Sequence, residues 1–214
     1  MSRNALPWRD LRYALWLPFY LLAFLLLERI PGRTYWATQL PIDSLVPFCD
    51  WFVIPYCLWY PLLIGVGLWL WRTNSGAFRR YMRFLACTFF LSELIWCFLP
   101  SMQELRVVPG DSLLSQVVAG LYRIDTPTNV FPSVHVVGSI GAALAAWDGG
   151  RDRPLLRRGV RLLALFICLS TVCVKQHSLM DVAGGLALSL AVAVPVYRQV
   201  LSPRVLRRRA AEEL

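Results

Sequence analysis

The chain contains only two histidines, His135 and His177, and each of them opens an apolar segment. An ionisable side chain in a membrane-crossing segment is rare and is a functional candidate by default. Asp181 lies four residues after His177, a spacing that puts both side chains on one face of a helix. A carboxylate that binds one ring nitrogen fixes the tautomer and frees the other nitrogen to act. The alternative is an ion pair that only ties helix ends together.

A second set of chemical groups surrounds His135. Turn- and cap-forming residues occupy positions 126–129, shortly before Pro132 and Ser133. Proline is favoured at the first position of a helix, so we expect an apolar helix to begin here. The free N–H groups and the positive dipole end of such a helix favour phosphate. Ser133 adds a hydroxyl donor, and Asn129 is counted with it as a substrate-binding candidate. The alternative is a helix cap with a histidine at the membrane interface.

The composition indicates a membrane protein. Hydrophobic residues make up 57% of the 214 positions and charged residues only 16%, whereas a soluble domain usually carries about 25% charged residues. Six apolar segments suit membrane crossing if polar neighbours or tilting complete their length. They are Tyr13–Leu27, Val53–Trp71, Phe84–Leu99, Ser133–Trp147, Leu162–Val174 and Val182–Tyr197. We therefore expect an all-α membrane protein, with residues 1–214 forming a single domain that is a six-transmembrane-helix bundle.

The distribution of positive charge predicts the orientation of these segments. Most of the 22 basic residues lie before residue 13, at 72–83, at 151–161 and after 197. The positive-inside rule assigns these stretches and both termini to the cytoplasm. Both histidines then lie at the extracytoplasmic face with the loop 100–132, which is long enough to contribute to an active site. The net charge of +9 follows this loop pattern. It therefore indicates topology and membrane lipids as partners, and not nucleic acid.

The two histidine segments together resemble a known family. The stretches DTPTNVFPSVHV (125–136) and KQHSLMDVAGG (175–185) are similar to the type 2 phosphatidic acid phosphatase (PAP2) superfamily. This superfamily includes bacterial lipid phosphatases, and inositol phosphorylceramide synthases are its lipid-transferase relatives. The resemblance extends to the six-span layout. It implies that His177 is the nucleophile and forms a phosphohistidine, that His135 is the general acid, and that Asp181 orients His177. It implies neither a metal nor another cofactor.

Two features of the family are missing, which places the chain with the branch that lacks the first motif. That motif, K-x-x-x-x-x-x-R-P, has no match on the histidine face, and Thr171 stands where the third motif often has arginine. A phosphoryl-transfer site still needs fixed donors for its developing negative charge. The substrate-binding candidates are therefore Lys175, the only lysine in the chain, with Arg123 and Arg106. Solvated or interfacial charges are the alternative interpretation of these three residues.

Three functions fit these features. The first is a lipid phosphatase of a bacterial plasma membrane that acts on phosphatidic acid, phosphatidylglycerol phosphate or a polyprenyl phosphate. The second is a lipid head-group phosphotransferase, in which a hydroxylated acceptor replaces water. The third is a non-catalytic membrane protein that binds or transports phospholipid. A zinc site built from His135, His177 and Asp181 is a minor variant. The sequence does not indicate an oligomeric state.

Overall fold

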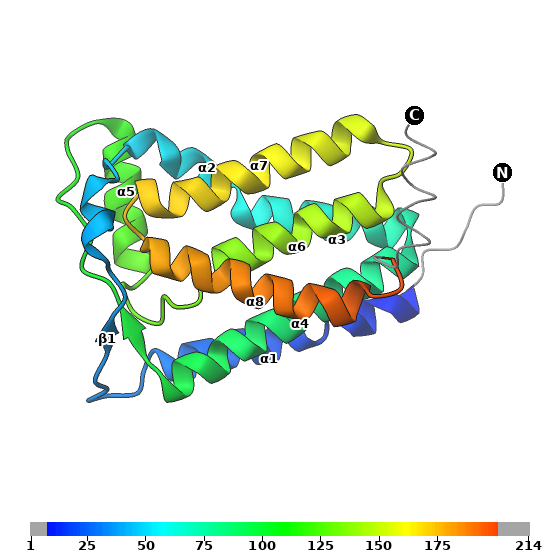
Figure 1. Cartoon of the computed structure of the whole chain (residues 1–214), viewed down its shortest axis with the longest axis horizontal. Helices are drawn as coiled ribbons and strands as arrows, with labels where there is room; N and C mark the ends of the chain where they lie inside the picture. Colours follow the sequence, from blue (N-terminus) through cyan, green and yellow to red (C-terminus); the bar gives the residue numbers. More distant parts are fainter. Residues whose placement is uncertain (1–7, 201–214) are drawn as a thin grey trace.

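Helices account for nearly all of the regular structure, as the sequence predicts for an all-α protein. The computed structural model describes residues 8–200. Its helices are α1 (Trp16–Leu27), α2 (Val53–Cys57), α3 (Trp59–Thr73), α4 (Ser75–Phe98), α5 (Leu113–Ile124), α6 (Val134–Gly149), α7 (Pro154–Cys173) and α8 (Leu179–Tyr197) (Figure 1). Three 3₁₀ turns accompany them: η1 (Trp8–Ala14), η2 (Pro41–Leu45) and η3 (Asp50–Phe52). Within the described range, the only strands are β1 (Trp36–Ala37) and β2 (Ser101–Met102), which pair in parallel.

Among residues 8–200, four stretches are helical, long and apolar enough to cross a membrane. They are Trp8–Leu27, Asp50–Thr73, Ser75–Phe98 and Leu179–Tyr197, which match the first, second, third and sixth predicted segments. These stretches indicate a membrane protein. α6 has only 16 residues, and the first half of α7 carries Arg157, Arg158 and Arg161. Membrane crossing by α6 and α7, and with it the count of six spans, therefore stays a prediction.

α6 is the central helix of the bundle and contacts α3, α4, α7 and α8. Its residues are small where its neighbours cross it. A Cβ atom at Gly138 would lie 2.7 Å from Nε1 of Trp59, and one at Gly141 would lie 2.8 Å from the ring of Phe84. Glycine at these positions allows the rings of α3 and α4 to pack directly on the backbone of α6. This packing fixes the helix that carries His135 in its first turn.

The two histidine segments lie at one end of the bundle, and the two ends of the described chain lie at the other (Figure 1). At one end, Arg80 of α4 pairs with Asp148 of α6 at 2.7 Å, and the rings of Trp8 and Trp71 meet at 5.2 Å. Figure 1 shows the start of α1 and the end of α8 at this end, and β1, α5 and the first turns of α6 and α8 at the other. Both histidine segments therefore lie opposite the two ends of the described chain. The assignment of the histidine end to the extracytoplasmic side stays a prediction.

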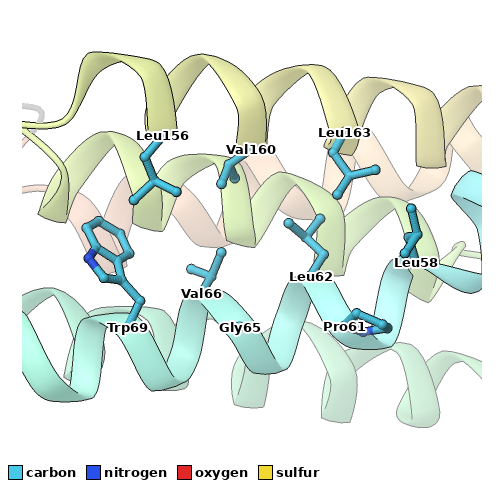
Figure 2. Close-up of a pocket in the computed structure, with 9 residues that line it drawn as sticks. All are labelled: Leu58, Pro61, Leu62, Gly65, Val66, Trp69, Leu156, Val160 and Leu163. Atoms are coloured by element: carbon cyan, nitrogen blue, oxygen red, sulfur yellow. The ribbon is translucent and has the colours of Figure 1, made fainter.

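An apolar groove of about 260 Å³ lies between α3 and α7 (Figure 2). Figure 2 shows side chains from both helices lining it, and none of them is charged. The lining residues are Leu58, Pro61, Leu62, Gly65, Val66, Trp69, Leu156, Val160 and Leu163. Gly65 leaves a gap in the α3 wall, because no other atom lies within 4 Å of the position that its Cβ would take. A surface of this kind suits the hydrocarbon chains of lipids.

Candidate active site

His135 and His177 lie beside each other at the histidine end of the bundle. Nε2 of His177 is 3.4 Å from Nδ1 of His135, and Nδ1 of His177 is 3.4 Å from Oδ2 of Asp181. The second contact has the length of an ion pair and is too poorly aligned for a hydrogen bond; catalytic contacts often tighten only when substrate binds. The exposed fractions are 8% for His135, 6% for His177 and 0% for Asp181. The structure thus brings together the three residues that the sequence predicts to be catalytic.

The first turn of α8 fixes the position of Asp181. Ser178 caps this helix: its Oγ accepts a hydrogen bond from the N–H of Asp181 (3.2 Å), and Oδ2 of Asp181 accepts one from the N–H of Ser178 (2.8 Å). This reciprocal arrangement satisfies two backbone donors at the helix start. His177 therefore lies just before α8 and not on its face. The helix-face explanation from the sequence is wrong in this respect, although the predicted proximity of His177 to Asp181 is present.

The starts of α6 and α8 are in backbone contact. Ser133 caps α6, with its Oγ 3.5 Å from the N–H of Val136, and its own N–H donates to the carbonyl of Asp181 (3.1 Å). Pro132 precedes this cap and does not occupy the first helical position as predicted. A Cβ atom at Gly185 would lie 3.0 Å from the carbonyl oxygen of Ser133. Glycine at this position therefore allows the close approach that brings the two histidines together.

Two aromatic rings hold the imidazole of His135. The ring centroids of Tyr56 and Trp59 each lie 4.5 Å from the imidazole centroid. The hydroxyl of Tyr56 donates to Oδ2 of Asp125 (2.7 Å), and Nε2 of Gln176 donates to the same oxygen (3.0 Å). This network connects α2, the loop before α6 and the residue next to His177. Tyr56, Asp125 and Gln176 are not among the residues that the sequence predicts for the site.

Arg106 braces the loop 100–132 against the segment that carries His177. Its Nε and one terminal nitrogen donate to Oε1 of Gln176 at 3.0 and 2.6 Å, and the other terminal nitrogen donates to the carbonyl of Tyr122 at 2.9 Å. The carbonyl of Asp125 accepts a further hydrogen bond. Burial lowers the pKa of this guanidinium, and the charge of Asp125 opposes that shift. Every nitrogen of this predicted substrate-binding side chain therefore already has a protein partner.

Lys175 is buried, and its ammonium group is bound to protein carbonyls. Nζ donates to the carbonyl of Asp43 (3.0 Å) and to that of Val46. Oδ1 of Asp43 in turn accepts a hydrogen bond from the N–H of Leu179 at the start of α8 (2.8 Å). The only lysine thus joins η2 to the turn that carries His177. Direct contact between Lys175 and a phosphate stays a prediction, and it requires the ammonium group to share or exchange these bonds.

The two remaining predicted binding residues have different environments. Arg123 is exposed in the last turn of α5, and its side chain makes no hydrogen bond to another of the residues 8–200. Asn129 is buried in a left-handed conformation with φ of 54°. Its Nδ2 donates to Glu28 at the end of α1, and Glu28 also accepts hydrogen bonds from the hydroxyls of Thr126 and Thr128. Glu28 therefore anchors the run of cap-forming residues that precedes α6.

A metal site is not present among the described side chains. Across residues 8–200, no group of three or more His, Cys, Asp or Glu side chains is placed to hold a metal ion. The arrangement of His135, His177 and Asp181 therefore does not support the zinc variant.

A comparison with known protein families identifies the family of the chain. The sequence profile of the PAP2 superfamily matches residues 34–194. The chain belongs to the PAP2 superfamily. No curated protein and no solved structure gives a significant match to the chain. The matched range includes both histidine segments, and membership in the family indicates a phosphatase or phosphotransferase that acts on a lipid phosphate in a membrane.

In this PAP2 protein, the close contact between α6 and α8 leaves no room for a side chain at Gly185. Gly185→Ala is expected to lower turnover by roughly 10-fold or more, because small displacements of reacting groups have large effects on rate. The new Cβ would meet the backbone of Ser133 and the stiff, β-branched Val136, which lies 2.9 Å away. Gly65→Ala is the matched control, since its Cβ would meet no atom within 4 Å. Turnover and thermal unfolding are compared in one detergent; unchanged turnover in Gly185→Ala would show that the close contact is not required.

Proposed function

We propose that the protein is a membrane lipid phosphatase in which His177 forms a phosphohistidine. One observation carries the proposal: Nε2 of His177 faces Nδ1 of His135 at 3.4 Å, while Asp181 lies beside the other nitrogen of His177. A covalent mechanism needs a nucleophile, a proton donor within reach of the leaving group, and a third group that orients the nucleophile. The three residues meet these needs, and the family supplies the phosphate-ester class of substrate.

The reaction consists of two displacements at phosphorus. In the first, Nε2 of His177 forms a bond to phosphorus while the bond from phosphorus to the lipid oxygen breaks, and this oxygen takes a proton from His135. In the second, a water molecule gives a proton to His135 and attacks phosphorus, which releases phosphate and free His177. Asp181 stabilises the positive charge that develops on the imidazole of His177. These steps balance without a metal or another cofactor.

The first turn of α6 is the proposed phosphate site. At the start of α8, the N–H of Leu179 already binds Asp43 and the N–H of Asp181 already binds Ser178. The first turn of α6 has N–H groups without helical partners, as every helix start does, and it also carries Ser133 and His135. A phosphate placed there would lie beside the histidine pair. Asn129, which is held by Glu28 directly before this turn, would shape the approach.

Arg123 is the proposed cation that reaches the phosphate from solvent, while Lys175 supports the site mainly from within. Arg123→Ala is expected to weaken activity by about 10-fold or more without lowering the unfolding temperature, because a charge-assisted contact contributes about 1.5–3 kcal/mol. Arg123→Lys should restore activity only in part, since the bidentate fork is lost. Lys175→Ala should lower activity at least as much, and it should also lower the unfolding temperature, because two carbonyls of the η2 segment lose their donor.

Arg29→Ala is the control for both substitutions, since Arg29 is an exposed cation at the same end of the bundle. It should leave both kinetics and unfolding unchanged. If Arg123→Ala behaves like Arg29→Ala, Arg123 is an ordinary interfacial charge and another group binds the phosphate.

A lipid panel tests the proposed reaction directly. The purified protein is given phosphatidic acid, phosphatidylglycerol phosphate and a polyprenyl phosphate in detergent, with and without a chelator. We expect at least one lipid to release inorganic phosphate at a rate that the chelator does not change. A product that forms only with a hydroxylated acceptor, and without free phosphate, would establish a phosphotransferase instead. Binding of intact lipid without any turnover would overturn the proposal of an enzyme.

A further inference from the structure

α5 has an apolar face that no described residue covers. Leu113, Val117 and Ile124 are 77%, 43% and 86% exposed. At 3.6 residues per turn, their positions fall within roughly 40° of one another around the helix axis. Large apolar side chains gathered on one exposed helix face mark an interaction surface.

The rest of α5 is fixed by packing, so this face has a defined direction. Val118 is buried, and Leu114, Leu121 and Tyr122 pack with it against Val53, Tyr56 and Val174 from α2 and the residue after α7. Gln116 and Arg123 lie on a third side of the helix and are exposed to solvent. Figure 1 shows α5 lying across the end of the bundle, with its axis turned away from the axes of α6 and α8.

α5 adjoins a helix with an exposed apolar surface. α5 packs on α2, which belongs to the apolar stretch Asp50–Thr73. α2 is followed directly by Leu58, one of the residues that line the groove in Figure 2. On the same segment, Trp51 is 68% exposed and Ile54 is 46% exposed. Exposed tryptophan is typical of the boundary between membrane and water. The neighbouring surface therefore belongs to a stretch that is long and apolar enough to cross a membrane.

We propose that α5 lies in the plane of the bilayer surface, with Leu113, Val117 and Ile124 inserted among the acyl chains. A helix with one apolar and one polar face takes this position at a membrane interface. Gln116 and Arg123 then face the head groups, where the charge of Arg123 attracts anionic lipid. The partner is a lipid surface and not a protein, because the face adjoins a membrane span and is flanked by a cation. Asp125 follows α5 directly and binds Tyr56 and Gln176, so the bilayer would also hold the loop that supports His135.

Photocrosslinking tests this placement without depending on enzymatic activity. The photoreactive residue p-benzoylphenylalanine replaces Val117 or Ile124 in the full chain, which is reconstituted in vesicles of phosphatidylethanolamine and phosphatidylglycerol. Gln116 is the matched control on the polar side of the same helix, and Ile64, 60% exposed in α3, is the positive control within a span. Thermal unfolding confirms that each variant folds like the parent protein.

After irradiation, mass spectrometry should find abundant phospholipid adducts for the probes at 117, 124 and 64, and markedly fewer for the probe at 116, which faces the head groups and water and not the acyl chains. The proposal is overturned if the probe at 64 gives lipid adducts while those at 117 and 124 give none. It is equally overturned if 117 and 124 crosslink to a second copy of the chain or to another protein in place of lipid.

Discussion

His177→Ala is expected to abolish turnover with every lipid phosphate that the protein accepts. The substitution removes the imidazole whose Nδ1 lies 3.4 Å from Oδ2 of Asp181 and whose Nε2 faces His135. His135 cannot take over its role, because its imidazole is packed against the rings of Tyr56 and Trp59, whose centroids each lie 4.5 Å from the imidazole centroid. A covalent mechanism without its nucleophile has no first step. Phosphate release is measured together with the trapping of radiolabelled phosphoryl protein.

Asp181→Asn is the informative comparison for this variant. An asparagine oxygen can still accept the hydrogen bond from the N–H of Ser178 that Asp181 now accepts at 2.8 Å, so the start of α8 is preserved while the charge is lost. This variant should still form phosphohistidine, but more slowly than the parent protein. Near-normal turnover of any substrate by His177→Ala would refute the phosphohistidine scheme.

The pairing of the histidines was predictable because its determinants are local in sequence. Alternating apolar segments, a helix start near Pro132 and the short spacing from His177 to Asp181 predict the three residues at one end of a bundle. The structure has them there. The helix starts were less predictable. The sequence suggested Pro132 as a first helical residue and His177 as part of a helix, whereas Ser133 and Ser178 are the caps. A proline or a histidine fits on either side of a cap, so the sequence alone does not determine the residue at which each helix begins.

The groups that support the histidines were not predictable, because chain segments far apart in the sequence create them. Tyr56 and Asp125 are 69 residues apart, and Gln176 and Asp125 are 51 apart. The sequence held only weak signals: Asp125 opens the run before Pro132, and Gln176 adjoins His177. Tyr56 gave no signal, since a tyrosine in an apolar segment is ordinary.

The roles of the three predicted cations also depend on contacts between distant parts of the chain. Lys175 and Arg123 adjoin the motifs, which suggested contact with phosphate, but proximity in sequence does not fix the direction of a long side chain. In the fold, Lys175 reaches back to η2, and Arg106 is bound to Gln176 and to the carbonyl groups of its own loop. Only Arg123 is left exposed. Tertiary contacts therefore separate three cations that are all binding candidates on the sequence alone.

His135→Ala is expected to lower turnover by roughly 10²–10⁴-fold, the usual range for the loss of one general acid. Nδ1 of His135 is the nitrogen that faces the nucleophile at 3.4 Å, so it is placed to protonate an oxygen that leaves the phosphorus. A lipid alcohol leaves poorly without a proton, whereas an aryl oxygen leaves as an anion. The loss in the rate of phosphohistidine formation should therefore be large with a lipid phosphate and small with an aryl phosphate, whereas hydrolysis of the phosphohistidine, which also uses His135, should slow equally for both.

Comparing these two substrates separates acid catalysis from a structural role. Tyr56→Phe is the control, because it keeps the ring beside His135 and removes only the hydroxyl that binds Asp125 at 2.7 Å. A change that merely loosens the site should slow both substrates to a similar extent, and this is the result expected for Tyr56→Phe. If His135→Ala also slowed phosphohistidine formation equally from both substrates, His135 would be a positioning residue, and the proton for the leaving group would have to come from another donor. Preserved cleavage of the aryl phosphate, with trapped phosphohistidine at His177, would instead assign the acid to His135, because the nucleophilic step would then be intact and only protonation lost.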